Sequence, residues 1–288
     1  METSELIKRV RKIEIKTRGL SRNIFAGEYH SAFKGRGMAF SEVREYQFGD
    51  DIRNIDWNVT ARYNKPFVKI YEEERELTVV LLIDISGSRE FGTISQLKKD
   101  IFTEVAATLA FSTIQNNDKI GVIFFSDKIE KFIPPKKGKK HVLHIIREMI
   151  DFKPESNKTD IAGALRYFTN AIKKSSTAFI VSDFMDSNFD KELTIASRKH
   201  DVVALQVYDI RETELPDVGL VKLKDAETGN YTWVDSSDRV ARSIYRDWWK
   251  DLSARLDYSF KRSRVDYVSI STNHDYVKSL ITLFKKRG

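Results

Sequence analysis

The chain of 288 residues contains no cysteine and only 5 prolines. The missing cysteines exclude disulfide bonds, thiolate zinc sites, iron–sulfur clusters and cysteine nucleophiles. Long apolar runs are also missing, because the longest, Val79–Ile83, is far shorter than the roughly 20 residues that cross a bilayer. The first residues are charged and have no apolar stretch typical of a secretory signal. We therefore expect no membrane span and a cytoplasmic protein, which a partner could recruit to the inner face of the membrane.

The charge balance is basic, with a formal net charge of +7. The basic residues are spread along the chain and interleaved with acidic ones, which is typical of solvated faces, although an anionic partner surface is an alternative. No nucleic-acid motif or stripe of basic and aromatic residues accompanies the charge. We therefore expect no nucleic-acid partner, and keep a basic nucleic-acid-binding protein only as a third hypothesis that rests on charge alone.

From residue 76 onward, strand-like and helix-like patterns alternate. The strand ELTVVLLID is apolar throughout, as expected of a strand buried on both faces of a parallel sheet. The alternation predicts an α/β fold of Rossmann type with a doubly wound, mostly parallel sheet. The predicted strands are 76–84, 118–126, 128–135 at an edge, 177–183, 201–209 and 264–271, and the predicted helices are 93–116, 139–150, 160–174, 188–199, 238–262 and 274–286.

Residues 1–75 differ in composition and pattern from the core expected at 76–288. They begin with a possible helix that places Leu6, Val10 and Ile13 on one face, and continue into a segment dense in Arg and Asp. We expect this N-terminal extension to pack on the core, with Trp57 as an anchor and Arg–Asp pairs fixing its geometry; a partner-facing charge cluster is the alternative. A second addition, near 218–236, is predicted to be an inserted β-hairpin.

The residues that carry chemistry follow the first core strand. Asp84, Ser86 and Ser88 form an Asp-x-Ser-x-Ser loop at its carboxyl end. Thr159 directly precedes the helix predicted at 160–174, and Asp183 ends the strand predicted at 177–183. Ligands of doubly wound sheets bind at the carboxyl ends of the strands, so these loops should meet at one edge. Because the donors are all oxygens, they suit a hard cation, and we expect one Mg²⁺ or Mn²⁺ per chain.

An ordinary structural reading exists for each of these residues, since Asp and Ser at strand ends often form turns and Thr159 or Asp160 could cap a helix. Three flanking residues, Arg89, Asp160 and Asp186, are candidates for contact with a partner. In a metal-dependent hydrolase or phosphatase, Asp160 or Asp186 could instead act as a general base. No phosphate loop or Gly-x-Ser-x-Gly elbow is present in the chain, which favours a protein that is not an enzyme.

The set Asp84, Ser86, Ser88, Thr159 and Asp183 resembles the metal-ion-dependent adhesion site of von Willebrand factor A domains. Further motifs resemble a bacterial family of unknown function that has a von Willebrand factor A-like core and is associated with MoxR-type AAA+ ATPases. Those motifs are Gly35-x-Gly37, Glu42–Tyr46, Gly49–Arg53, Ile55–Trp57, Ala61-Arg62, Ser182–Phe184, Asp209 with Glu212 before Leu215-Pro216, and Asp225–Gly229. Arg89 departs from the family pattern, where many relatives carry Met.

The resemblance implies a non-enzymatic interaction module that binds a partner through the metal. An acidic side chain of the partner would complete the coordination of the cation, and the surrounding surface would supply specificity. A MoxR-type ATPase is the expected partner on the family resemblance alone, in the assembly or remodelling of other proteins.

Overall fold

The structure is a computed structural model that describes residues 11, 13–14, 38–73, 77–92 and 96–287. It divides the chain into two compact units, one formed by residues 34–77 and the other by the remainder. The predicted boundary at residue 75 lies close to the end of the smaller unit. Most of the helix predicted around Leu6 and Val10 lies outside the described residues. Whether residues 1–75 pack on the core stays a prediction.

The smaller unit is a two-stranded antiparallel sheet of β1 (Met38–Glu45) and β2 (Phe67–Glu73), joined through the 3-10 turn η1 (Ile52–Asn54) and helix α3 (Trp57–Tyr63). Two Arg–Asp pairs shape the connection, as expected: Arg44 donates to both oxygens of Asp50 at 2.7 and 2.8 Å, and Arg53 pairs with Asp51. Trp57 does not serve as an anchor within this unit, because 70% of its surface is exposed there.

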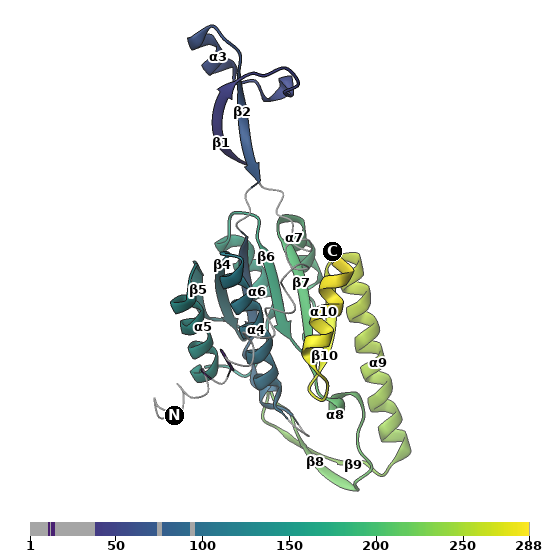
Figure 1. The fold of residues 1–288 in the computed structure, drawn as a ribbon. Coiled ribbons are helices and arrows are strands. Elements are labelled where there is room, and N and C mark those ends of the chain that lie inside the picture. Colours follow the sequence, from purple (N-terminus) through teal and green to yellow (C-terminus); the bar gives the residue numbers. More distant parts are fainter. Residues whose placement is uncertain (1–10, 12, 15–37, 74–76, 93–95, 288) are drawn as a thin grey trace. The chain divides into compact units, whose positions relative to one another are not determined.

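The larger unit is built on a six-stranded sheet in the order β10-β7-β6-β3-β4-β5 (Figure 1). All neighbouring strands are parallel except β5, which pairs antiparallel with β4 at the edge. The order confirms the predicted doubly wound, mostly parallel sheet. The strands are β3 (Thr78–Asp84), β4 (Lys119–Phe125), β5 (Ile129–Lys136), β6 (Thr177–Ser182), β7 (Asp201–Tyr208) and β10 (Asp266–Ser271).

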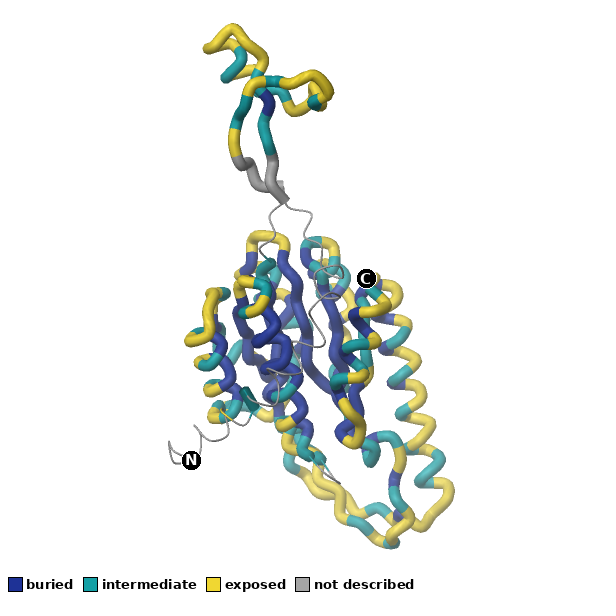
Figure 2. Tube along the Cα trace, viewed as in Figure 1, coloured by how far each residue is buried: buried dark blue, intermediate teal, exposed yellow. Residues whose placement is uncertain are grey.

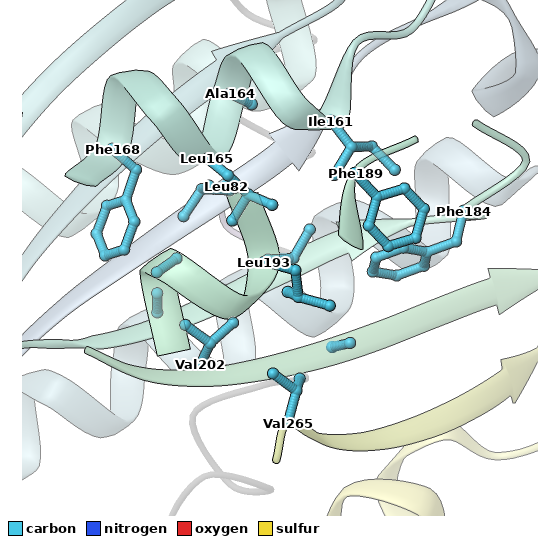
Figure 3. Packing of buried hydrophobic residues seen from close by; sticks show 14 of the residues in the cluster. Leu82, Ile161, Ala164, Leu165, Phe168, Phe184, Phe189, Leu193, Val202 and Val265 are labelled. Atoms are coloured by element: carbon cyan, nitrogen blue, oxygen red, sulfur yellow. The ribbon is translucent and has the colours of Figure 1, made fainter. Parts of the chain in front are cut away.

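Helices cover both faces of this sheet, whose four central strands β7, β6, β3 and β4 are buried almost throughout (Figure 2). On one face, apolar side chains of β3, β6 and β7 pack against α6, α7 and α9, for example Leu82 against Leu165 and Leu193 (Figure 3). On the other face lie α4, α5 and α10, with Phe179 of β6 in edge contact with Phe284 of α10. The helices are α4 (Lys98–Gln115), α5 (Lys139–Asp151), α6 (Ile161–Ala171), α7 (Asp190–Lys199), α9 (Arg239–Arg262) and α10 (Tyr276–Arg287).

Two predicted helix boundaries are corrected by the backbone. The helix expected from residue 93 begins at Lys98, because Leu97 is extended. The helix expected to reach residue 174 ends at Ala171, because Ile172 leaves the helical conformation. None of the helices among the described residues has both the length and the apolar character that crossing a membrane requires.

The inserted hairpin is confirmed as β8 (Leu220–Lys224) and β9 (Tyr231–Asp235), which pair antiparallel apart from the main sheet. It follows the short helix α8 (Ile210–Thr213) and precedes α9. In Figure 1 the hairpin extends from the end of the sheet at which β6 and β7 finish. That end is the one where ligands of doubly wound sheets bind.

Candidate metal site

Asp84 ends strand β3 and is buried, with 1% of its surface exposed. One carboxylate oxygen accepts a hydrogen bond from the Ser86 backbone N–H at 2.9 Å, and the other accepts one from the Ser182 hydroxyl at 2.7 Å. Burial, together with the negative charge of Asp183, raises the pKa of Asp84 to about 6. A buried carboxylate held by neutral donors is one that a cation would stabilise in its charged form.

The two serines of the loop stand together beside this carboxylate. The hydroxyl oxygens of Ser86 and Ser88 are 3.1 Å apart, and Ser88 also lowers the pKa of Asp183. Ser88 lies in the short 3-10 turn η2 (Gly87–Glu90), which starts directly after Ser86. This tight turn brings the hydroxyls of Ser86 and Ser88 close together.

Asp183 follows β6 and is the second buried carboxylate. Its Oδ2 is 2.8 Å from the ammonium of Lys98, which has no exposed surface and also lies 2.6 Å from Glu212. Burial would raise the pKa of Asp183, but the charge and hydrogen bond of Lys98, with the hydrogen bond of Ser88, outweigh burial and lower it. Asp183 is therefore held ionised inside the domain.

The third loop is joined to the other two through backbone hydrogen bonds. The N–H of Gly87 donates to the carbonyl of Asn157 at 3.0 Å, and the N–H of Ile161 donates to Asp186 at 2.8 Å. The half-buried Thr159 lies between these two anchor points in the chain. The structure thus brings together the three loops that carry the five expected metal ligands.

The three flanking residues, Arg89, Asp160 and Asp186, make structural contacts within the domain. Asp160 caps α6 by accepting from the Gly163 N–H at 2.8 Å, as the helix-capping alternative predicts. Both oxygens of Asp186 accept backbone N–H bonds, from Ile161 and Ser187. The side chain of Arg89 is only 11% exposed and donates to the carbonyl of Phe152 at 3.0 Å. Arg89 therefore offers little surface to a partner.

Sequence reasoning missed Lys98 and gave no role to Ser182. A signal existed for Lys98, since it stands at i−4 and i−7 from Phe102 and Val105 on the buried side of α4. The network extends beyond the site: Glu212 accepts from the Asp209 N–H at 2.8 Å, and Asp209 accepts from the Thr272 hydroxyl at 2.7 Å. Asp209 and Glu212, which belong to one of the family motifs, form a capping box around α8 and so have a structural role.

The donor set fits a divalent cation. The single charge of Lys98 is shared between Asp183 and Glu212, while Asp84 is held by a hydroxyl and a backbone N–H. An added cation would compensate this excess of buried negative charge. Within the described part of the chain, no three His, Asp or Glu side chains gather into a metal-holding group; the site depends on two carboxylates and on hydroxyl oxygens.

Comparison with known proteins assigns the family. The model of the family described as "Protein of unknown function DUF58" matches residues 42–255. The chain belongs to the DUF58 family. This chain is similar to the uncharacterized protein Rv1480 of Mycobacterium tuberculosis. The two are 31% identical over 232 residues, which cover 80% of this chain and 73% of that protein.

Solved structures also match this DUF58 chain. An aerotolerance-related membrane protein from Bacteroides fragilis matches 73% of this chain and 99% of its own, with a TM-score of 0.50 and 14% identity. The von Willebrand factor A domain of SpRpn10 matches 73% of this chain and 95% of its own, with a TM-score of 0.42 and 11% identity. At these identities the likeness concerns the fold alone.

Proposed function

We propose that this chain is a protein-interaction module that binds one divalent cation, Mg²⁺ or Mn²⁺, and uses it to hold an acidic side chain of a partner. The observation that carries the proposal is that the loops after β3 and β6 meet the loop before α6, with two buried carboxylates and two serine hydroxyls near one another. Such a set of hard oxygen donors matches what Mg²⁺ and Mn²⁺ prefer.

In this proposal Asp84 and Asp183 balance the charge of the cation, and Ser86, Ser88 and Thr159 contribute neutral oxygens. The metal supplies a Lewis-acidic centre that attracts a carboxylate of the partner. The residues of the chain hold that centre in place: Ser182 orients Asp84, and Lys98 keeps Asp183 ionised. Both supporting groups are buried.

Specificity would come from exposed apolar side chains near the hairpin. Leu220, Tyr231 and Trp233 share one face of the β8–β9 hairpin, because each pair in its register is directly opposed. Lys222 lies on the same face, with its ammonium 4.3 Å from the Tyr231 ring centroid. A second exposed apolar row runs along α9 at four-residue spacing, through Val240, Ile244 and Trp248. Exposed apolar surface of this kind is typical of protein interfaces.

The partner expected from the family resemblance is a MoxR-type AAA+ ATPase. We propose that the module acts as a non-enzymatic adaptor for such an ATPase in the assembly or remodelling of other proteins. It would do so in the cytoplasm or, through a partner, at the inner face of the membrane. This part of the proposal rests on the resemblance and not on the geometry.

The test is a calorimetric titration of Mg²⁺ and Mn²⁺ into the wild type and Asp84→Ala, with Asp251→Ala on α9 as a control for removing an exposed carboxylate. Binding by the wild type and the control, and its loss in Asp84→Ala, supports the site. A pull-down with the immobilised chain, with and without EDTA, then tests the partner. Metal binding that persists in Asp84→Ala, or partners indifferent to EDTA, would contradict the proposal. Asp84-dependent turnover of simple phosphoesters would favour the hydrolase alternative instead.

A further inference from the structure

The inserted hairpin is a small sheet with two open edges. Among the described residues, β8 and β9 pair with each other and with no further strand, and four of the five residues of β8 are exposed. A two-stranded sheet of this kind is marginally stable on its own, and its edges can accept another strand. The hairpin therefore has the properties of a docking element.

The register shows which backbone groups of the hairpin face outward. The N–H of Asp225 donates to the carbonyl of Asn230 at 2.8 Å, and the N–H of Ser236 donates to the carbonyl of Gly219 at 2.9 Å. These are hydrogen-bonded pairs of the antiparallel ladder, in which every second pair has this character. Residues of the intervening pairs direct their N–H and C=O groups away from the partner strand, and on β8 they are Leu220, Lys222 and Lys224. No group in the described part of the chain bonds to these outward groups.

The open edge of β8 is basic. The side chains of Lys222 and Lys224 lie on the same face as Tyr231 and Trp233, which are directly opposed to them in the register. The ammonium of Lys222 is 4.3 Å from the Tyr231 ring centroid and 5.8 Å from that of Trp233. A strand added to this edge would place its own side chains beside the two lysines. Acidic side chains at alternate positions of that strand would match them.

Two other occupants fit this edge less well. A second copy of β8 would bring its own lysines next to Lys222 and Lys224, and like charges on neighbouring strands repel each other. Single-stranded nucleic acid binds by stacking its bases on aromatic rings, but the ammonium of Lys222 already lies over the rings of Tyr231 and Trp233. The charge and the open backbone groups together favour an acidic strand.

We propose that the outer edge of β8 binds an extended segment of a partner protein by strand addition, and that this segment carries acidic side chains at alternate positions. Main-chain hydrogen bonds to the outward groups of β8 hold the segment, while Lys222 and Lys224 select its charge. The inference goes beyond the proposed function, because this binding does not need the cation.

The turn of the hairpin lies directly against the metal loop. A Cβ atom placed on Gly87 would lie 2.4 Å from the carbonyl oxygen of Ala226, much closer than side-chain and backbone atoms approach each other. Gly87 stands between Ser86 and Ser88 of the candidate site, and Ala226 stands in the connection between β8 and β9. A segment that follows β8 toward this turn therefore approaches the proposed metal ligands.

The experiment uses the full chain in EDTA and measures the binding of a fluorescein-labelled peptide of alternating Glu and Val residues by fluorescence anisotropy. We expect this peptide to bind, and a peptide of alternating Lys and Val residues not to bind. The double variant Lys222→Gln, Lys224→Gln should bind the acidic peptide about two- to thirtyfold more weakly, because two opposite-charge pairs are lost. Lys250→Gln with Lys261→Gln removes the same charge from exposed positions of α9 and should match the wild type.

A second measurement separates strand addition from attraction between charges alone. N-methylation of the Val residues blocks the N–H groups along one edge of the extended peptide, and N-methylation of the Glu residues blocks those along the other. Only one edge of an added strand faces β8. We therefore expect one of the two methylated peptides to lose binding and the other to keep it.

Two results would overturn the inference: no binding of the acidic peptide by the wild type, or equal effects of the two methylations. Oligo(dT) is tested as a rival anion, and its binding through Lys222 and Lys224 in place of the peptide would assign the edge to nucleic acid instead. Because EDTA is present throughout, these results leave the proposed metal site to its own calorimetric test. Near-ultraviolet circular dichroism verifies that the variants are folded.

Discussion

The ammonium of Lys98 lies 2.8 Å from the carboxylate of Asp183, and neither side chain has more than 3% of its surface exposed. Glu212 completes the arrangement at 2.6 Å from the same ammonium. Two buried carboxylates thus depend on one lysine, and one of them is a proposed metal ligand. Lys98 links the candidate site to the capping box that begins α8.

We expect Lys98→Met to lower the free energy of unfolding of the metal-free protein by about 3–5 kcal/mol, because it leaves buried carboxylates uncompensated. Chemical denaturation measures this loss. Saturating Mn²⁺ should stabilise Lys98→Met at least as much as the wild type, since the ion supplies positive charge at Asp183. Lys99→Met is the matched control, because Lys99 pairs with the exposed Glu90 and should cost less than about 1 kcal/mol. Equal losses in both variants would contradict the role given to Lys98.

The central fold could be predicted because strands buried on both faces leave a strong pattern in the sequence. β3 and β6 are continuous apolar runs that end in Asp84 and Ser182-Asp183. The topology of a doubly wound sheet then places those ends at one edge. What could not be predicted depends on pairing between distant residues: Lys98 meets Asp183 and Glu212, which are 85 and 114 residues away along the chain.

The hairpin of β1 and β2 escaped prediction for a related reason. Its strands carry alternating charged residues, and 21 residues of turn and helix separate Glu45 from Phe67. No short turn signal marks such a pairing. Trp57 has 70% of its surface exposed within its own unit, and its expected role as an anchor to the core stays a prediction. The contact of Ala226 with Gly87 has no pattern in the sequence at all, since it is made by a backbone carbonyl.

Metal affinity should depend on pH through Asp84. Its pKa of about 6 in the metal-free protein means that protons compete with the cation below that value. We expect the affinity for Mn²⁺ to be nearly constant above about pH 7 and to fall by up to about tenfold per pH unit well below pH 6. Calorimetry between pH 5 and 8 measures the profile. Ser182→Ala removes a hydrogen bond that lowers the pKa of Asp84, so its profile should move to higher pH. A profile without a step in this range would contradict the assignment.

His200 gives a pH dependence of stability that is independent of the metal. Its Nδ1 is 3.0 Å from the Ser176 hydroxyl and its ring lies 4.4 Å from the Phe168 ring. Burial, with the charge of Lys199, lowers the pKa of His200 from 6.5 to about 4. The folded protein therefore binds fewer protons than the unfolded chain between these values, so the stabilisation is complete above pH 6.5 and is lost as the pH falls toward 4.

We expect the wild type to lose up to roughly 3 kcal/mol from this group between pH 6.5 and pH 4, at about 1.4 kcal/mol per pKa unit. His200→Gln should show a flatter dependence over that interval, although its stability at pH 7 will be lower because the ring is buried. The measurement is urea denaturation at several pH values, with His274→Gln as a control for replacing an exposed histidine. Parallel curves for the wild type and His200→Gln would show that His200 is not the group responsible.

Because Gly87 lies against Ala226, the stability lost on substituting Gly87 should depend on the hairpin turn. In Gly87→Ala the new Cβ would lie 2.4 Å from the Ala226 carbonyl oxygen and 3.1 Å from Cβ of Asn157, so the loop or the hairpin turn must move. We expect a loss of about 1–3 kcal/mol in stability, typical of overpacking, together with weaker Mn²⁺ binding because the serines on either side of Gly87 are displaced. Denaturation and calorimetry measure the two effects.

Shortening the hairpin removes the contact of residue 87 with Ala226 and leaves its contact with Asn157, so the two effects can be measured apart. Replacing residues 225–230 with Asn-Gly keeps the register of β8 and β9, because Lys224 and Tyr231 are already paired and a two-residue turn joins such strands. In that background Gly87→Ala should reduce the stability by less than it does in the full chain, and the difference should be at least about 1 kcal/mol. The reason is that only the contact with Asn157 remains. A double-mutant cycle between the two changes gives the coupling energy. A coupling of zero would mean that the hairpin turn does not rest on the metal loop in solution.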